Sequence, residues 1–124
     1  MLRGGAPGTC GMAGSCSHQY VVEADGSVYP CDFYMLDEYR LGNLQTNSFA
    51  QIEEQRERLQ FIPRSRELDK ACRACPYGPI CRGGCRRNRE TAGGGALTLN
   101  YFCQSFQMFF QYTLPRLQAL AFRR

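Results

Sequence analysis

Cysteine is the residue type in this 124-residue chain whose number and spacing could do chemistry. Four of the eight cysteines fall within 14 residues in the pattern C-x₂-C-x₅-C-x₃-C, with glycine and proline between them that let the backbone turn tightly. Such spacing lets several thiolates reach one metal centre, and eight cysteines are enough for two four-thiolate sites. The cysteines are Cys10, Cys16, Cys31, Cys72, Cys75, Cys81, Cys85 and Cys103.

All-thiolate sites suit zinc or iron–sulfur clusters. The spacing matches neither a zinc ribbon, whose CxxC pairs lie about 15–20 residues apart, nor the cysteine runs of ferredoxins. The N-terminal residues lack the apolar segment of a secretory signal, so we expect the cytoplasm, where disulfides are rare. Iron–sulfur clusters, a structural zinc-binding interaction domain and a disulfide framework all remain open on the residues alone.

The formal net charge is +4, and several arginines lie between Arg82 and Arg89. A nucleic-acid-binding surface would explain them, but the rest of the chain has no basic stripe with aromatic residues between the charges. Arginines that offset the negative charge of metal–thiolate sites explain their position among the cysteines better. No run of about 18 apolar residues is present. We therefore expect neither nucleic acid nor a membrane as a partner.

Leu, Ile, Val and Phe together make up about 20% of the chain, at the edge of what sustains a core. Bound metal that cross-links distant segments, here called metal stapling, would compensate for so small a hydrophobic core. An Asp-Gly pair between β-prone runs at 19–23 and 27–31 predicts a β-hairpin, which delivers Cys31 and Asp32 to the end of its second strand.

Two helices are predicted outside the cysteine-rich loops. Ser48 and Gln51 form a capping box that starts a mid-chain helix, and Pro63 is expected to end it. An apolar pattern with spacings of three and four predicts a C-terminal helix over about 100–122, kinked at Pro115. The sequence thus predicts a small, metal-stapled α+β fold as a single domain over residues 1–124.

The order of the cysteines resembles the SPASM domain, the iron–sulfur extension of many radical SAM enzymes. CGMAGSC, VVEADGSVYPCDFY, YRLGN, CRGGCRRNRE and NYFCQSFQMFF are similar to the C-terminal part of anaerobic sulfatase-maturating enzymes, over residues 8–118. This resemblance implies a SPASM-like fold and two auxiliary 4Fe–4S clusters. It assigns the first cluster to Cys10, Cys16, Cys31 and Cys85, and the second to Cys72, Cys75, Cys81 and Cys103.

The resemblance also implies a function, because this family oxidises a sulfatase cysteine or serine to formylglycine. The expected role of the chain is to accept electrons and place the substrate polypeptide. The family's proposed base falls on Asp32, whose alternative role is a strand-end carboxylate bonded to nearby backbone. The C-x₃-C-x₂-C motif of the radical-generating cluster is absent, as is length for the barrel that binds S-adenosylmethionine. We therefore do not expect the chain to be active without such a barrel as its partner.

Overall fold

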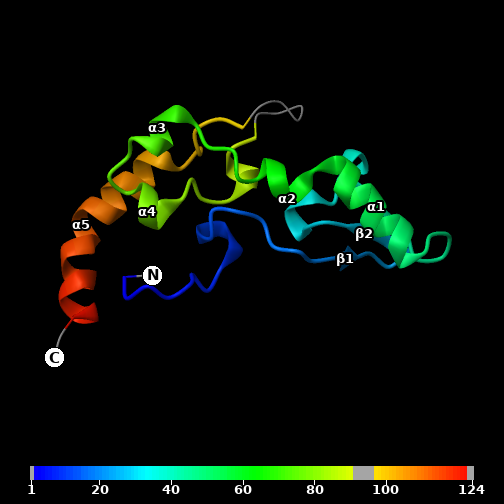
Figure 1. Ribbon diagram of the computed structural model, residues 1–124, viewed down its shortest axis with the longest axis horizontal. Coiled ribbons are helices and arrows are strands. Elements are labelled where there is room, and N and C mark those ends of the chain that lie inside the picture. Colours follow the sequence, from blue (N-terminus) through cyan, green and yellow to red (C-terminus); the bar gives the residue numbers. More distant parts are fainter. Residues whose placement is uncertain (1, 91–96, 123–124) are drawn as a thin grey trace. The chain divides into compact units, whose positions relative to one another are not determined.

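The computed structural model describes residues 2–90 and 97–122, in two compact units that are each built around their own contacts (Figure 1). Unit 1 combines Met1–Cys16 with Arg66–Arg124, and unit 2 is Ser17–Ser65. The predicted α+β fold is confirmed, because unit 2 contains an antiparallel sheet and both units contain helices. A single domain spanning residues 1–124 stays a prediction.

The sheet of unit 2 consists of β1 (Val21–Val22), β2 (Ser27–Tyr29) and β3 (Gly42–Asn43), in that order and antiparallel throughout. The predicted hairpin is β1 and β2. Asp25 fixes its turn, because its carboxylate accepts hydrogen bonds from the Ser27 backbone N–H at 2.9 Å and the Ser27 hydroxyl at 2.8 Å. These hydrogen bonds lower the pKa of Asp25. Strand β3 was not predicted, since two residues carry no alternation that marks a strand.

The mid-chain helix α1 spans Phe49–Leu59 and begins with the predicted capping box. The Ser48 backbone N–H donates to the Gln51 side-chain carbonyl at 2.9 Å, and the Ser48 hydroxyl accepts from the Gln51 N–H at 3.3 Å. The predicted end at Pro63 is wrong. Helix α1 ends at Leu59 because Gln60 has φ +50°, and Pro63 lies inside the next short helix α2 (Phe61–Arg64).

Two groups of buried side chains make the core of unit 2. Ile52 on α1 packs onto the sheet, and α2 brings Phe61 against two tyrosines at edge-to-face angles. The tyrosines come from the 3₁₀ helices η2 (Asp32–Tyr34) and η3 (Asp37–Tyr39). The aliphatic group is Val28, Leu41, Ile52 and Leu59, and the aromatic group is Tyr34, Tyr39 and Phe61.

Unit 1 holds η1 (Cys10–Met12), α3 (Lys70–Arg73), α4 (Gly78–Cys81), η4 (Arg86–Asn88) and α5 (Cys103–Ala121). The two one-turn helices α3 and α4 lie in the segment predicted as loops. The C-terminal helix is confirmed, and Pro115 lies inside α5, which changes direction along its length in Figure 1. Across residues 2–90 and 97–122, no helix combines the length and apolar character that crossing a membrane requires.

Replacing Ile52 with alanine should open unit 2 locally. Ile52 is fully buried, and such a truncation costs about 3 kcal/mol. Since each 1.4 kcal/mol is a factor of ten, hydrogen exchange at the Leu41 amide, which donates to Val28, should accelerate by about 100-fold. Phe49→Ala on the same helix is the control, because Phe49 is 68% exposed. Equal exchange rates in the two variants would contradict this core.

Candidate functional site

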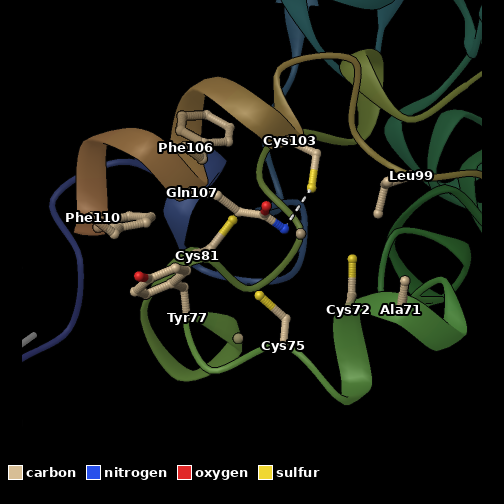
Figure 2. A pocket seen from close by; sticks show the side chains of 12 residues that line it. Ala71, Cys72, Cys75, Tyr77, Cys81, Leu99, Cys103, Phe106, Gln107 and Phe110 are labelled. Carbon is tan, nitrogen blue, oxygen red and sulfur yellow. Dashed lines mark hydrogen bonds between the residues drawn. The ribbon is translucent and has the colours of Figure 1, made fainter. Parts of the chain in front are cut away.

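Four thiol side chains surround one cavity of unit 1. Cys72 lies in α3, Cys81 ends α4, Cys103 begins α5, and Cys75 lies between the two short helices. Figure 2 shows their sulfur atoms facing the same space. This four-thiol cavity has a volume of about 60 Å³. The rest of its lining is Ala71, Tyr77, Gly78, Gly83, Leu99, Phe106, Gln107 and Phe110.

Local hydrogen bonds place the thiols that come from the cysteine-rich segment. Asp69 caps α3, because its carboxylate accepts the backbone N–H two residues later at 2.8 Å. Pro79 lies in the first turn of α4, where its fixed φ suits a helix start. Helix α4 ends after Cys81 because Arg82 has φ +52° and turns the chain back. Two one-turn helices therefore present their cysteines to one side.

Burial raises the pKa of both Cys72 and Cys81, and the neighbouring Cys103 thiol adds to the rise. At Cys81, a hydrogen bond from the Gly83 backbone N–H lowers the pKa and partly opposes these effects. Thiolates here repel one another and are poorly solvated, so a positively charged metal centre is what stabilises them. Metal binding at this cavity releases the thiol protons.

Aromatic side chains form one wall of the four-thiol cavity. The rings of Tyr77 and Phe110 lie 5.8 Å apart between centroids, and those of Phe106 and Phe110 lie 6.4 Å apart. Figure 2 shows this wall coming from α5 and from the start of α4. An apolar wall limits the access of water to the sulfur atoms and lowers the local dielectric constant.

Three further thiols line a second, smaller cavity of unit 1, with a volume of about 10 Å³. Arg82 fixes the N-terminal segment that carries two of them, because its guanidinium donates to the Met12 carbonyl at 3.2 Å. The structure thus brings together three of the four cysteines that the resemblance assigns to the first cluster. This three-thiol cavity is lined by Cys10, Gly11, Ser15, Cys16, Gly84, Cys85, Arg86 and Arg89.

Two consecutive glycines line the two cavities, Gly83 the four-thiol cavity and Gly84 the three-thiol cavity. Both have left-handed φ angles, +81° and +69°. A Cβ atom on Gly83 would lie 2.6 Å from Leu68, and one on Gly84 would lie 2.5 Å from the Asn100 amide nitrogen. That amide donates to the Gly83 carbonyl at 2.9 Å. Both the conformation and the space at this turn require glycine.

Buried arginines border the three-thiol cavity. Arg86 is 1% exposed, and its Nε atom donates to the Glu90 carboxylate at 2.7 Å. Arg89 is also buried and donates to the Glu67 carbonyl at 2.5 Å. The buried Glu90 carboxylate pairs with Arg86 and neutralises its charge, so the offsetting of a metal–thiolate site by these arginines stays a prediction.

Cys31 and Asp32 belong to unit 2, where they follow β2 and begin η2. Cys31 is buried and Asp32 is exposed. The Cys31 thiol donates to the Asp32 carboxylate, with 3.2 Å between Sγ and Oδ1. The place of Cys31 in the first cluster, and the role of Asp32 as the base, stay predictions.

Sequence reasoning missed two polar side chains at these cavities. Asn100 is buried and holds the glycine turn from 17 residues away, so no local pattern marks it. Gln107 lines the four-thiol cavity and donates to the Cys103 sulfur, with 3.6 Å between Nε2 and Sγ. Its position four residues after a helical cysteine is a signal that could have found it.

The family model described as SPASM, an iron–sulfur cluster-binding domain, matches residues 10–76, which is more than half of the chain. The chain belongs to this family. A cysteine-type anaerobic sulfatase-maturating enzyme of Clostridium perfringens is 48% identical to this SPASM chain over 113 residues. A serine-type enzyme of Bacteroides thetaiotaomicron is 32% identical over 114 residues. The matches cover 91% and 90% of the chain, but 30% and 28% of those proteins.

The solved structure described as native anSMEcpe with bound AdoMet and Cp18Cys peptide superimposes on this SPASM chain with a TM-score of 0.83, at 47% identity. The superposition covers 92% of this chain and 32% of that one. This likeness confirms the predicted SPASM-like fold. The chain spans about 30% of the length of the curated relatives it matches.

The thiols fit an iron–sulfur cofactor. All eight cysteines lie in the described parts of the chain, and none of them forms a disulfide. Four thiols surround one cavity, as suits a cluster whose iron atoms each take one thiolate. The family confirms iron–sulfur clusters and does not favour the zinc-binding interaction domain.

Replacing Gly84 with alanine should impair cluster binding. The added Cβ would strain a left-handed residue and collide with Asn100, which holds the turn between the two cavities. We expect the purified variant to retain less than half the iron of the wild type, measured per chain after anaerobic reconstitution. Gly8→Ala is the matched control, since a Cβ there meets nothing within 4 Å. Full iron content in the Gly84 variant would contradict a required glycine.

Proposed function

We propose that this SPASM domain is the auxiliary-cluster part of a radical SAM oxidoreductase that converts a sulfatase cysteine or serine to formylglycine. The observation that carries the proposal is the pair of thiol-lined cavities joined by the Gly83–Gly84 turn. The matches to cysteine-type and serine-type sulfatase-maturating enzymes support the same reaction class. The proposed cofactors are two 4Fe–4S clusters, with S-adenosylmethionine bound by a barrel outside this SPASM chain.

This oxidation removes a hydrogen atom, a proton and an electron from the substrate side chain. A serine then becomes the aldehyde directly, whereas a cysteine becomes a thioaldehyde that water hydrolyses with release of hydrogen sulfide. Bound clusters supply the chemistry of accepting that electron. The chain's own residues hold them in place: Cys10, Cys16, Cys31 and Cys85 for the first cluster, and Cys72, Cys75, Cys81 and Cys103 for the second. Apolar side chains of α5 limit the access of water to the second set of cysteines.

We propose that Asp32 is the base that accepts the proton removed from the substrate side chain. Its carboxylate is exposed at the start of η2, so a substrate thiol or hydroxyl has access to it. Phe33, which follows it, is 61% exposed and offers an apolar contact for a polypeptide. A base must lie within hydrogen-bonding reach of the proton that it removes, and this pair places a base and an apolar contact side by side.

The proposed partners are a sulfatase polypeptide as substrate and a radical SAM barrel. The peptide bound in the anSMEcpe structure supports a polypeptide substrate. We place the protein in the cytoplasm, where thiols stay reduced and available to iron.

Anaerobic reconstitution with iron and sulfide tests the cofactors. Two 4Fe–4S clusters predict about eight iron and eight sulfide per chain, with a brown absorption shoulder near 400 nm. Iron, acid-labile sulfide and zinc are counted on one sample. Cys103→Ala should lose about half of the iron, whereas its helix neighbour Ser105→Ala should lose none. About two zinc ions without sulfide would contradict the proposal.

Asp32→Asn tests the base. The chain is placed in the Clostridium perfringens relative in exchange for the matching part, and formylglycine is measured by mass spectrometry on a cysteine-containing sulfatase peptide. Loss of a general base lowers the rate by about 10²–10⁴-fold, while iron content stays unchanged. Asp37→Asn, at the start of η3 in the same unit, is the control and should keep the rate. A rate within twofold for Asp32→Asn would exclude it as the base.

A further inference from the structure

Gln107 has an unusual position in the four-thiol cavity. The lining is thiols, glycines and apolar or aromatic side chains, with two exceptions that carry a side-chain N–H or O–H other than a thiol. One is Tyr77, whose hydroxyl points away from the sulfur atoms in Figure 2. The other is Gln107, whose side chain reaches from α5 into the space between the cysteines (Figure 2). Its carboxamide is therefore the polar group that the cavity presents to the sulfur atoms.

The contact between Gln107 and Cys103 follows from the helix that carries both. Residues four apart lie on the same face of a helix, one turn from each other. The Gln107 Nε2 atom lies 3.6 Å from the Cys103 Sγ atom and donates to it. A thiolate can only accept hydrogen bonds, so the NH₂ end of the carboxamide, not its oxygen, must face a metal-bound Cys103.

A hydrogen bond to a ligand sulfur changes the redox balance of a cluster. One-electron reduction adds negative charge that is shared with the thiolates, so an N–H donor stabilises the reduced form more than the oxidised form. Gln107 is exposed, so the preference rests on the hydrogen bond itself and not on burial.

We propose that Gln107 is a positioning residue for the second cluster, which raises the reduction potential of that cluster by donating its side-chain N–H to Cys103. This inference deepens the proposed function and rests on it, because a higher potential makes the second cluster a better acceptor of the substrate electron. The three-thiol cavity has no such carboxamide in its lining, which contains arginines instead. The effect of Gln107 should therefore be confined to one of the two clusters.

The test is a redox titration of the reconstituted chain with dithionite, followed by electron paramagnetic resonance of the reduced clusters. Gln107→Leu removes the donor and keeps most of the side-chain volume. We expect the equilibrium constant of one of the two one-electron reductions to fall by a factor of about ten, which lowers its reduction potential by 59 mV. The other step should not move.

Two further variants separate this effect from a structural one. Gln111→Leu changes the same residue type one turn later, outside both thiol-lined cavities, and should shift neither step. Gln107→Asn keeps the amide on a shorter side chain. It should lower the potential as Gln107→Leu does, with the iron content of the wild type. An exchangeable proton coupled to the reduced second cluster should be lost in both Gln107 variants.

Unchanged steps in Gln107→Leu, or equal shifts of both steps, would overturn the proposal. Loss of half the iron in both Gln107 variants would also overturn it, by making the residue a requirement for cluster assembly. Failure of the proposed function is a different result. In that case the two reduction steps respond as expected, but the Clostridium perfringens relative that carries this chain in place of its own matching part forms no formylglycine.

Discussion

The burial of thiols that also repel one another once ionised is the constraint on which unit 1 depends. Burial and the Cys103 thiol both raise the pKa of Cys72 and Cys81, so the metal-free cavity favours protonated sulfur. A positively charged cluster core reverses that preference and holds together segments that are far apart in sequence. The one-turn helices, the left-handed turn after Cys81 and the start of α5 are local solutions that bring thiols to such a core.

The surroundings of the two thiol groups differ in chemistry. Aromatic rings and one carboxamide line the four-thiol cavity, whereas buried arginines border the three-thiol cavity. The Gly83–Gly84 turn contributes one residue to each, and Asn100 fixes it. Clusters bound at these two cavities can therefore have different potentials, since aromatic rings and a carboxamide face one set of thiols and arginines border the other. Under the proposed function, that difference makes one of the two clusters the better electron acceptor.

Unit 2 reaches stability by other means. Its core is a small group of aliphatic side chains and a trio of aromatic rings, and the Ser48 and Asp25 hydrogen bonds fix its helix start and hairpin turn. This conventional packing carries Cys31 and Asp32 at the end of β2. A small fraction of large apolar residues is sufficient for the chain, because metal bound to thiols replaces much of the hydrophobic core that unit 1 would otherwise need.

The sequence by itself determined what depends on neighbouring residues. Cysteine number and spacing indicated metal–thiolate sites, Asp-Gly predicted the hairpin, and Ser48 with Gln51 predicted the helix start, because each effect acts within a few residues. Family motifs added the iron–sulfur identity that spacing left open. Spacing alone left the partners of Cys85 open; the family motifs grouped it with Cys10 and Cys16, and the three line one cavity. Only the tertiary structure decided that Gln60 ends α1 and that Asn100 holds the glycine turn. These outcomes depend on space and partners contributed by distant segments, which no local pattern records.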